Sequence, residues 1–408
     1  MRTPGRRSSR VQPGTMRERS PGHWQLRVYV GRDPVTGKSR QVTRTFKGGE
    51  RAAAKAFAAL VTEVETGSFN RTSATVSQLL DKWLEAGEWS QRPRTLYENR
   101  RKIDGRIRPI LGHILLAELE PDVIDAAYRM WLDDGLSPTT VHKYHCILSA
   151  ACRQAVKWGW IDDAPTARST PPRVERTEMK VPTPAQVSVL IKAAEDRDPV
   201  LGTAVALAAL TGARRGELVA LRWSDIDLTN GRVKIARSLT VAQGERHMGS
   251  TKTHASRDVA LDPVGVEVLN RRWAYMIDLS IRSQSPIMPD SYVLSYRANG
   301  AFPVNPDSLT HGFRRLCEAM AQPALEKLRE AIPMAKKTDL APGERWGFRF
   351  HDLRHFSVTT LIAAGVDVRT VADRHGHANA TMTLNRYAHA LPERDREAAG
   401  LLGAALKL

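Results

Sequence analysis

Two arginines in the second half of the chain stand where a helix is expected to begin. The stretch ALTGARRGELVALRW, residues 209–223, places Arg214 and Arg215 just after Gly212. A cation is unfavourable at the start of a helix, because the helix dipole is positive there. The position suits an arginine that faces an anion, since guanidinium binds phosphate oxygens through paired hydrogen bonds. Glu217 follows Arg214 by three residues, which indicates a partner that holds this side chain, or else an ordinary surface salt bridge.

Three further stretches carry polar side chains that helix packing does not require. Lys252 lies in a turn between two strand patterns, in STKTHASRDVAL. In FRFHDLRHFS, residues 348–357, the spacing i, i+3 and i+4 puts three side chains on one helix face, those of His351, Arg354 and His355. The stretch DRHGHANATMTLNRYAHA, residues 373–390, adds His375, His377, Tyr387 and His389.

Together these residue types suit attack on a phosphodiester bond. Arginines neutralise the charge that develops on the phosphorus oxygens in the transition state. A histidine and a lysine transfer protons. A tyrosine hydroxyl serves as the nucleophile and forms a covalent phosphotyrosine, which conserves the energy of the broken bond. Such chemistry needs neither a metal ion nor ATP, so we expect no cofactor.

The histidine pair of FRFHDLRHFS also invites comparison with the zinc-hydrolase pattern H-E-x-x-H. A zinc helix needs Glu after the first histidine, because the longer carboxylate reaches the metal-bound water, whereas Asp352 is one methylene shorter. Arg354 on the same face would repel a divalent cation. No third ligand stands at a recognisable spacing, so we expect no metal at this position.

The charge of the chain indicates a polyanionic partner. Its 408 residues include 61 Lys and Arg against 44 Asp and Glu, a net charge of +17. Residues 1–71 hold 15 of the basic residues and 5 of the acidic ones. Clustered cations bind nucleic acid by releasing phosphate counterions, although a basic surface or a disordered tail has the same composition. No apolar run reaches 18 residues, which predicts no membrane span, and the 3 cysteines form no C-x-x-C pair, as in a reduced cytoplasmic protein.

The N-terminal part of the chain predicts a small DNA-binding domain. Residues 1–20 are Arg, Ser, Pro and Gly with little to bury, which predicts a disordered basic arm. Residues 21–71 show strand periodicity followed by a helical pattern. Arg27, Arg40 and Arg44 lie on the predicted strands, where a β-ribbon would fit a DNA groove. An ordinary small domain with solvated arginines has the same pattern.

The rest of the chain is expected to be mainly helical. Residues 72–165 predict a helical domain in which Thr75 and Ser137 are N-caps. Its second helix carries a basic face for DNA phosphates that includes Arg94, Arg100 and Arg101. The Pro- and Thr-rich residues 166–180 predict a linker. Residues 181–408 form the last domain, with strands near 231–262 and an insertion at 319–347.

The order Arg, Lys, His-x-x-Arg, His, Tyr resembles the tyrosine recombinase, or phage integrase, family. TGARRGELVALRW resembles the family's first arginine motif, HDLRH its His-x-x-Arg motif, and GHANATMTLNRYAH its Gly-His to Tyr-x-His motif. His375 departs from the family, which usually has leucine before Gly-His, and residues 319–347 exceed the usual spacing. The resemblance implies a fold that is mainly α with small β elements. Its parts would be an arm-type DNA-binding domain with a three-stranded sheet plus helix, a SAM-like helical domain for core sites, and a mixed α/β catalytic domain.

The resemblance also implies a role for each polar residue. Carried over by position, it makes Tyr387 the nucleophile, while Arg214 and Arg354 would clamp the scissile phosphate. His351 would be the general acid/base, and Lys252 would protonate the leaving 5′ oxygen. The remaining assignments are a hydrogen bond to the phosphate from His377, and supporting positions at Glu217 and His389.

The function implied is site-specific recombination of double-stranded DNA through a Holliday junction. The partners would be core and arm-type attachment sites, further copies in a homotetramer, and accessory DNA-bending and excision factors. The arm-type domain favours an integrase of a phage or other integrative element, acting at the nucleoid in the cytoplasm of a bacterial host. A Xer-like chromosome or plasmid dimer resolvase and a type IB topoisomerase are alternatives that would lack this domain. A catalytically silent DNA-binding protein is a further alternative, against which the full set of polar residues argues.

Overall fold

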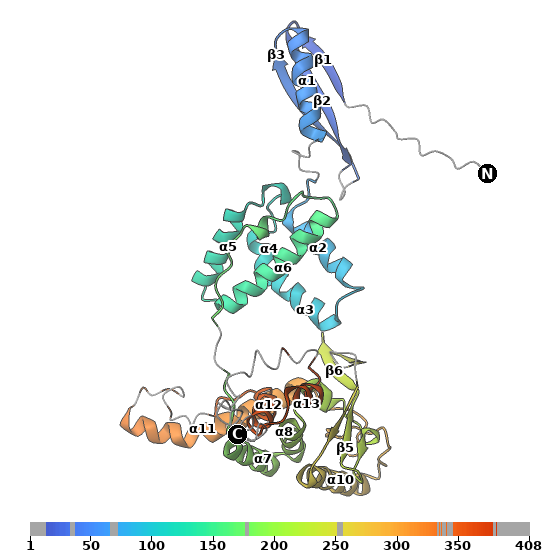
Figure 1. The fold of residues 1–408 in the computed structure, drawn as a ribbon, viewed down its shortest axis with the longest axis vertical. Helices are drawn as coiled ribbons and strands as arrows, with labels where there is room; N and C mark the ends of the chain where they lie inside the picture. Colours follow the sequence, from blue (N-terminus) through green and yellow to red (C-terminus); the bar gives the residue numbers. More distant parts are fainter. Residues whose placement is uncertain are drawn as a thin grey trace, which may run out of the picture. The chain divides into compact units, whose positions relative to one another are not determined.

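The computed structural model describes residues 14–32, 37–65, 72–175, 179–250, 256–332 and 346–377, with residues 334, 336, 340 and 381. The chain divides into two compact units, residues 1–176 and 177–408 (Figure 1). The fold is mainly helical with small antiparallel sheets, as the resemblance implies. No helix among the described residues is long and apolar enough to cross a membrane. Lys252, Tyr387 and His389 lie outside the described residues.

The first unit begins with a three-stranded antiparallel sheet covered by one helix. The strands run in the order β1 (Thr15–Ser20), β2 (His23–Arg32) and β3 (Ser39–Lys47), and α1 spans Glu50–Glu65. Alternate residues of β2, among them Leu26 and Val28, are buried against Leu60 of α1. The prediction of a strand and helix domain is therefore confirmed, including the three-stranded sheet.

The prediction of a disordered arm over residues 1–20 is wrong for residues 15–20, which form β1. This strand is mostly exposed, and Met16 is its apolar contact with the core. Its hydrogen bonds to β2, in a register that pairs Met16 with Leu26, hold it in the sheet. An edge strand of this kind has little hydrophobic pattern of its own, because backbone pairing rather than burial places it.

The remainder of the first unit is helical. It comprises α2 (Val76–Gly87), α3 (Pro93–Lys102), a π-helical turn (Ile103–Ile107), α4 (Arg108–Leu111), a 3₁₀ turn (Leu116–Glu118), α5 (Pro121–Asp133) and α6 (Pro138–Lys157). Thr75 closes a capping box with Gln78 at the start of α2, and the Ser137 hydroxyl accepts a hydrogen bond from the Thr140 N–H at the start of α6. Both predicted N-caps are confirmed.

The predicted linker begins later than residue 166. A 3₁₀ turn at Pro165–Ala167 packs on the helical domain, where Thr166 is 2% exposed. The Thr170 N–H donates to the Asp125 carboxylate of α5 at 2.7 Å. A Pro- and Thr-rich composition therefore describes a segment that is partly fixed by side-chain hydrogen bonds.

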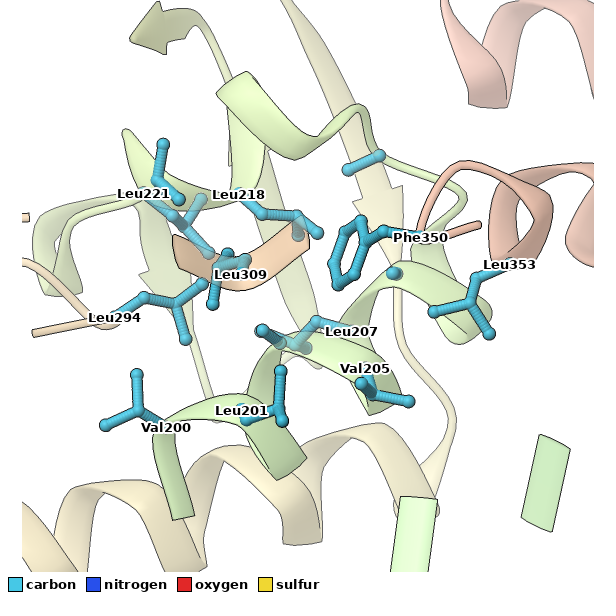
Figure 2. Close-up of a cluster of buried hydrophobic side chains, with 14 of the residues drawn as sticks. Val200, Leu201, Val205, Leu207, Leu218, Leu221, Leu294, Leu309, Phe350 and Leu353 are labelled. Atoms are coloured by element: carbon cyan, nitrogen blue, oxygen red, sulfur yellow. The ribbon is translucent and has the colours of Figure 1, made fainter. Parts of the chain in front are cut away.

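At the centre of the second unit lies α8 (Pro199–Thr211), a helix that the other elements of this unit bury. The unit's first helices are α7 (Pro184–Arg197), α8 and α9 (Arg215–Val219). Nearly all of α8 is buried, as expected for an apolar helix in the middle of a core. Figure 2 shows Leu201, Val205 and Leu207 of α8 meeting apolar side chains from several other elements, among them Leu218, Leu294 and Leu353.

Four of the described strands of the second unit lie within the predicted range of 231–262, and β4 precedes it. A 3₁₀ turn (Trp223–Asp225) leads into β4 (Ile226–Asp227) and β5 (Arg232–Ile235), which form an antiparallel sheet with β8 (Arg257–Ala260). Between β5 and β8 the chain forms a hairpin of β6 (Arg237–Ala242) and β7 (Glu245–Ser250). The sheet brings β8 beside α13, so that residues from both elements line one site.

The last helices are α10 (Pro263–Ser283), α11 (Pro306–Ala331), α12 (Asp352–Ala363) and α13 (Val368–His375). The predicted insertion at 319–347 begins inside α11, which continues to Ala331 through an internal proline, Pro323. Leu325 of this extension is buried with Leu340 in a small separate cluster. The first part of the insertion is thus a helical extension with its own core.

Candidate active site

Arg214 stands at the junction of α8 and α9. Gly212 ends α8 with a left-handed φ of 61°, and a Cβ there would come within 2.2 Å of the His375 ring. The chain then turns so that Arg214 becomes the N-cap of α9, as the sequence predicts. Its guanidinium donates to the Glu217 carboxylate at 2.9 Å and to the carbonyl oxygen of Gly376 at 2.9 Å.

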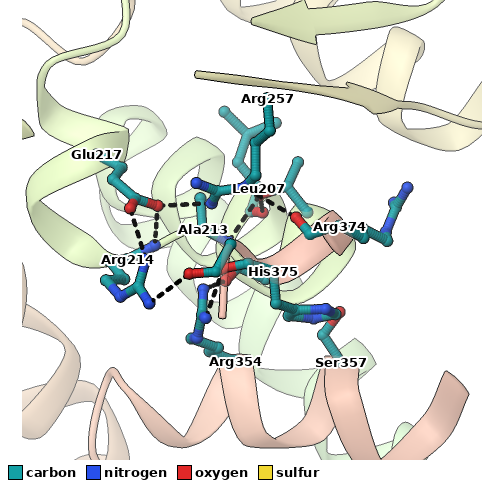
Figure 3. Close-up of polar contacts among 12 residues, drawn as sticks. Leu207, Ala213, Arg214, Glu217, Arg257, Arg354, Ser357, Arg374 and His375 are labelled. Carbon is teal, nitrogen blue, oxygen red and sulfur yellow. Dashed lines mark hydrogen bonds and ion pairs between the residues drawn. The ribbon is translucent and has the colours of Figure 1, made fainter. Parts of the chain in front are cut away.

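Glu217 is a buried carboxylate held by two arginines. Its oxygens accept hydrogen bonds from the Arg214 backbone N–H at 2.9 Å and from Arg257 Nη2 at 2.6 Å, besides the Arg214 guanidinium (Figure 3). Burial alone would raise the pKa of Glu217, but the hydrogen bonds and charges of Arg257 and Arg214 outweigh it, so the pKa lies below its ordinary value. The predicted pairing with Arg214 is therefore present, and it is not a surface salt bridge.

Arg354 is buried where α12 approaches the ends of α8 and α13. The side chain is 3% exposed, and its guanidinium donates to the carbonyl oxygens of Gly212 and His375, both at 2.6 Å (Figure 3). Carbonyl groups at helix C-termini lack partners within their own helix, and Arg354 supplies donors for two of them. A buried cation fixed in this way cannot swing into solvent, so its direction is defined before any anion arrives.

The histidine pair lies at the start of α12. His351 is the exposed N-cap, and its ring lies 4.8 Å from that of buried His355 in an edge-to-face arrangement. The adjacent Asp352 carboxylate accepts hydrogen bonds from the Arg349 backbone N–H at 2.7 Å and from its guanidinium at 2.8 Å. The Asp352 carboxylate is therefore already bonded to Arg349, the residue three positions before it. Across the part of the chain that the structure describes, no group of three His, Cys, Asp or Glu residues is placed to hold a metal ion.

His377 lies just beyond α13, among the arginines. Burial first, and then the positive charges of Arg354, Arg214 and Arg257, lower its pKa to about 4. The imidazole is therefore neutral near pH 7, and a neutral imidazole carries one N–H donor, the kind of group that stabilises an oxyanion.

Two residues that contribute to this site, Arg257 and Arg374, are not predicted by the sequence patterns, and His375, although named among the polar residues, has no predicted role. Arg257 on β8 bonds Glu217, and Arg374 on α13 donates to the carbonyl oxygens of Leu210 and Ala260. His375 is fully buried between Val371 and Ser357, where burial and the charge of Arg354 lower its pKa to about 3. A signal for Arg257 existed, because it shares the inward face of its strand with buried Val259, a position where a charge needs a partner.

The arginines predicted to bind DNA in the first unit are surface residues with different surroundings. Arg100 and Arg101 are exposed on α3, where Arg94 forms an ion pair with Glu98 at 3.0 Å. In the sheet, Arg27 pairs in register with Thr43 on the open face. Arg40 and Arg44 alternate with these residues on the face that α1 covers, and Arg44 donates to Glu63 of α1 at 2.8 Å.

Arg27 therefore lies on the opposite face of the sheet from Arg40 and Arg44. Residues 40 and 44 share the strand parity of the core residues Val42 and Phe46, which sets their face. Arg17 and Arg19, which fall within the segment predicted to be disordered, lie on β1. The Arg19 side chain donates a hydrogen bond to Gln25 of β2 at 2.9 Å. The open face thus gains basic residues from the strand that the sequence did not reveal.

The site as a whole is suited to an oxyanion. The guanidinium groups of Arg214 and Arg354 are fixed close to the neutral His377, while Arg257 bonds Glu217, which balances part of the positive charge. Donors of this kind, fixed by the fold, stabilise charge on a phosphate without having to reorganise. The structure brings together four of the predicted residues, Arg214, Glu217, Arg354 and His377, and places His351 on the same helix as Arg354.

Comparison with known proteins gives matches over most of the chain. Residues 180–394 match the phage integrase family, and residues 90–170 match the phage integrase SAM-like domain. The ICEBs1 integrase of Bacillus subtilis is 26% identical over 395 residues, covering 93% of this chain and 97% of that protein. A protein described as tyrosine recombinase XerC-like from Caldanaerobacter subterraneus is 21% identical over 403 residues, covering 92% and 94%.

Solved structures share the fold. The integrase of the Tn1549 transposon, in complex with transposon right end DNA, superposes with a TM-score of 0.63 at 22% identity, covering 81% of this chain and 99% of that one. The lambda integrase tetramer bound to a Holliday junction gives a TM-score of 0.52 at 20% identity, covering 91% and 97%.

Proposed function

The chain belongs to the phage integrase family, and on this premise we propose that it is the integrase of a phage or other integrative element. As a site-specific tyrosine recombinase it acts on DNA. One observation carries the proposal for the site: Arg214 and Arg354, from two separate helices, are both anchored on backbone carbonyls around His377. An arrangement of this kind fits the two non-bridging oxygens of one phosphate.

In the proposed reaction, the Tyr387 hydroxyl attacks the scissile phosphorus and forms a 3′-phosphotyrosine. The bond between phosphorus and the 5′ oxygen breaks, and this leaving oxygen takes a proton from Lys252, while His351 accepts the proton of the tyrosine hydroxyl. Arg214 and Arg354 neutralise the charge on the phosphate, and His377 donates a hydrogen bond to it. Rejoining is the reverse, with the 5′ hydroxyl of another strand as the nucleophile. Glu217 supports Arg214 in this scheme, and His389 has a supporting position near the nucleophile.

The first unit supplies the surfaces proposed for binding along the DNA. The exposed arginines of α3 suit the phosphates of a core site, and the open face of the N-terminal sheet suits an arm-type site. The lambda relative is a tetramer on a Holliday junction. We propose the same assembly for this chain, with accessory DNA-bending and excision factors, acting at the nucleoid in the bacterial cytoplasm.

A Xer-like dimer resolvase has the same chemistry and is the second candidate, because one of the relatives carries a XerC-like description. The N-terminal sheet with its helix favours the integrase, since a two-domain resolvase would lack it. A type IB topoisomerase is disfavoured on the same ground. A silent DNA-binding protein would not need the buried Arg354 and Glu217, with Arg214 bonded to Glu217, at one site.

The test is a trap for covalent protein–DNA complexes. Wild type and Tyr387→Phe are mixed in EDTA with nicked duplexes from the flanks of the protein's own gene, and SDS gels report label that stays on the protein. Tyr275→Phe, at a 39% exposed tyrosine on α10, is the matched control. We expect complexes with wild type and the control alone. Covalent attachment by Tyr387→Phe would refute the nucleophile, and binding without attachment by the wild type would favour the silent binder.

A further inference from the structure

The end of α13 is held by arginines from three different elements. The carbonyl oxygens of residues 374, 375 and 376, which are consecutive, accept hydrogen bonds from Arg257 at 2.9 Å, Arg354 at 2.6 Å and Arg214 at 2.9 Å respectively (Figure 3). The last carbonyls of a helix are the negative end of its dipole, so cations are favourable there. Two of these arginines belong to the proposed phosphate clamp, whereas Arg257 has no role in it.

Arg257 is largely buried and bonds two other elements, unlike an arginine in a surface ion pair. Its side chain is 9% exposed, and it joins β8 to both α9 and α13 through Glu217 at 2.6 Å and the Arg374 carbonyl at 2.9 Å. Its Nη1 is buried and has no hydrogen-bond partner among the described residues. A Cβ at Gly376 would come within 2.9 Å of this nitrogen, so the loop needs glycine to approach it.

The Glu217 carboxylate explains why a second arginine matters. Glu217 is almost fully buried and ionised, and it accepts hydrogen bonds from both Arg214 and Arg257. Without Arg257, the buried charge would have only Arg214 as a cationic partner among the described side chains that bond it. Arg214 would then turn both arms of its guanidinium toward the carboxylate and lose the bond to Gly376 that directs it at the phosphate.

We propose that Arg257 is a positioning residue for strand cleavage, which shares Glu217 with Arg214 and fixes the end of α13 so that Arg214 and His377 face one phosphate. The inference rests on the proposed function, because it takes the Arg214 and Arg354 pair as the phosphate clamp. Arg257 itself is not expected to touch DNA. A purely structural ion pair would instead affect the stability of the fold and leave the cleavage rate of the folded protein unchanged.

The test separates folding, binding and cleavage in Arg257→Met and Arg257→Lys. Each variant is assayed for thermal unfolding, for affinity to a nicked duplex, and for the single-turnover rate of covalent attachment at saturating DNA. Arg282→Met, at an exposed arginine of α10 that pairs with Asp278, is the matched control. We expect Arg257→Met to slow attachment about 100-fold, the effect of a small misplacement of reacting groups, with little change in affinity. Lysine should restore part of the rate, because it reaches one of the two partners.

A double variant, Arg257→Met with Glu217→Gln, guards against failure to fold, because it removes the unpaired buried carboxylate together with its partner. We expect it to fold and to cleave as slowly as Arg257→Met. Wild-type attachment rates in the folded Arg257→Met protein would overturn the inference. Full recovery in the double variant would also overturn it, since Arg257 would then only balance the charge of Glu217.

A second readout does not depend on cleavage and distinguishes failure of the inference from failure of the proposed function. The His377 ring signal, identified by its loss in His377→Gln, is titrated by NMR in the DNA-free protein. The wild-type pKa should be about 4, and Arg257→Met should raise it, because a positive charge near the ring is lost. An unchanged titration would overturn the inference even where the wild type forms no covalent complex, and that lack of complex would itself count against the proposed function.

Discussion

Arginines in the two units of the molecule have opposite surroundings. Around the end of α13 they are largely buried and bind backbone carbonyls, as Arg354 does with Gly212 and His375. Around α3 and α4 they are exposed or half-buried and pair with nearby carboxylates, such as Arg94 with Glu98 at 3.0 Å and Arg106 with Asp134 at 3.1 Å. The residue type is the same, but one group is fixed by the fold and the other is free to exchange partners.

The difference indicates two ways of using a cation on DNA. An exposed ion pair contributes about 0–1 kcal/mol, so a phosphate easily replaces its carboxylate and the side chain adapts to many positions along the backbone. A buried guanidinium held by carbonyls keeps one direction and serves one phosphate. The comparison is tested by matched substitutions of a buried and an exposed charged residue.

The largest effect is expected for Arg354→Lys. A lysine keeps the charge but cannot donate to both carbonyls and a phosphate together, so single-turnover covalent attachment should fall about 1000-fold. Arg106→Lys in the first unit is the control and should leave the rate at saturating DNA unchanged. A similar loss in both variants would mean that charge, and not fixed direction, is what the buried group provides.

The next largest effect is expected for Glu217→Gln, which should lower the free energy of unfolding. Removing one partner of a buried ionic group costs about 3 kcal/mol, whereas Glu98→Gln on exposed α3 should cost less than about 1 kcal/mol. Urea unfolding of the two variants gives the comparison directly. Because the folded pKa of Glu217 lies below its ordinary value of 4.5, its contribution is present above that pH and is lost as the pH falls. Equal effects of the two substitutions would contradict the distinction between the regions.

A smaller effect is expected from the protonation of His375, which makes the free energy of unfolding depend on pH. Its pKa is lowered to about 3 in the fold, first by burial and then by Arg354, while the unfolded chain takes up a proton near 6.5. The unfolded state therefore binds more protons in this interval, and stability should fall as the pH drops below about 6.5, by up to about 1.4 kcal/mol per pH unit. His375→Leu should flatten part of this fall in urea titrations between pH 5 and pH 7, with the remainder due to His377. A slope unchanged by the substitution would show that His375 is not the group that titrates.

The smallest effect is expected for a single exposed arginine. Arg101→Gln should reduce affinity for DNA less than about tenfold and lower the slope of log K against log salt by about 1, because one phosphate contact is lost. Filter binding at several salt concentrations measures both, with Arg271→Gln on α10 as the control. The attachment rate at saturating DNA should not change, and a large change would place Arg101 in the reaction itself.

The sequence predicted those features that local chemistry determines. Thr75 and Ser137 are N-caps because hydroxyl groups at helix starts bond the free N–H groups, and Glu217 reaches Arg214 because three residues along a helix bring them together. The strand β1 has no apolar face that would predict it, because hydrogen bonds to β2 hold it in the sheet. The role of Arg257 could not be predicted, because its partners, Glu217 and the Arg374 carbonyl, come from distant parts of the chain.

The anchors at the end of α13 have a consequence for how this site tolerates mutation. A carbonyl oxygen belongs to the backbone, so it is present whichever side chain the residue carries. His375 can therefore occupy a position that usually holds leucine while its carbonyl still accepts the hydrogen bond from Arg354. The acceptor at residue 375 therefore survives any change of side chain that this buried position can hold, whereas the donor is lost with any substitution of Arg354.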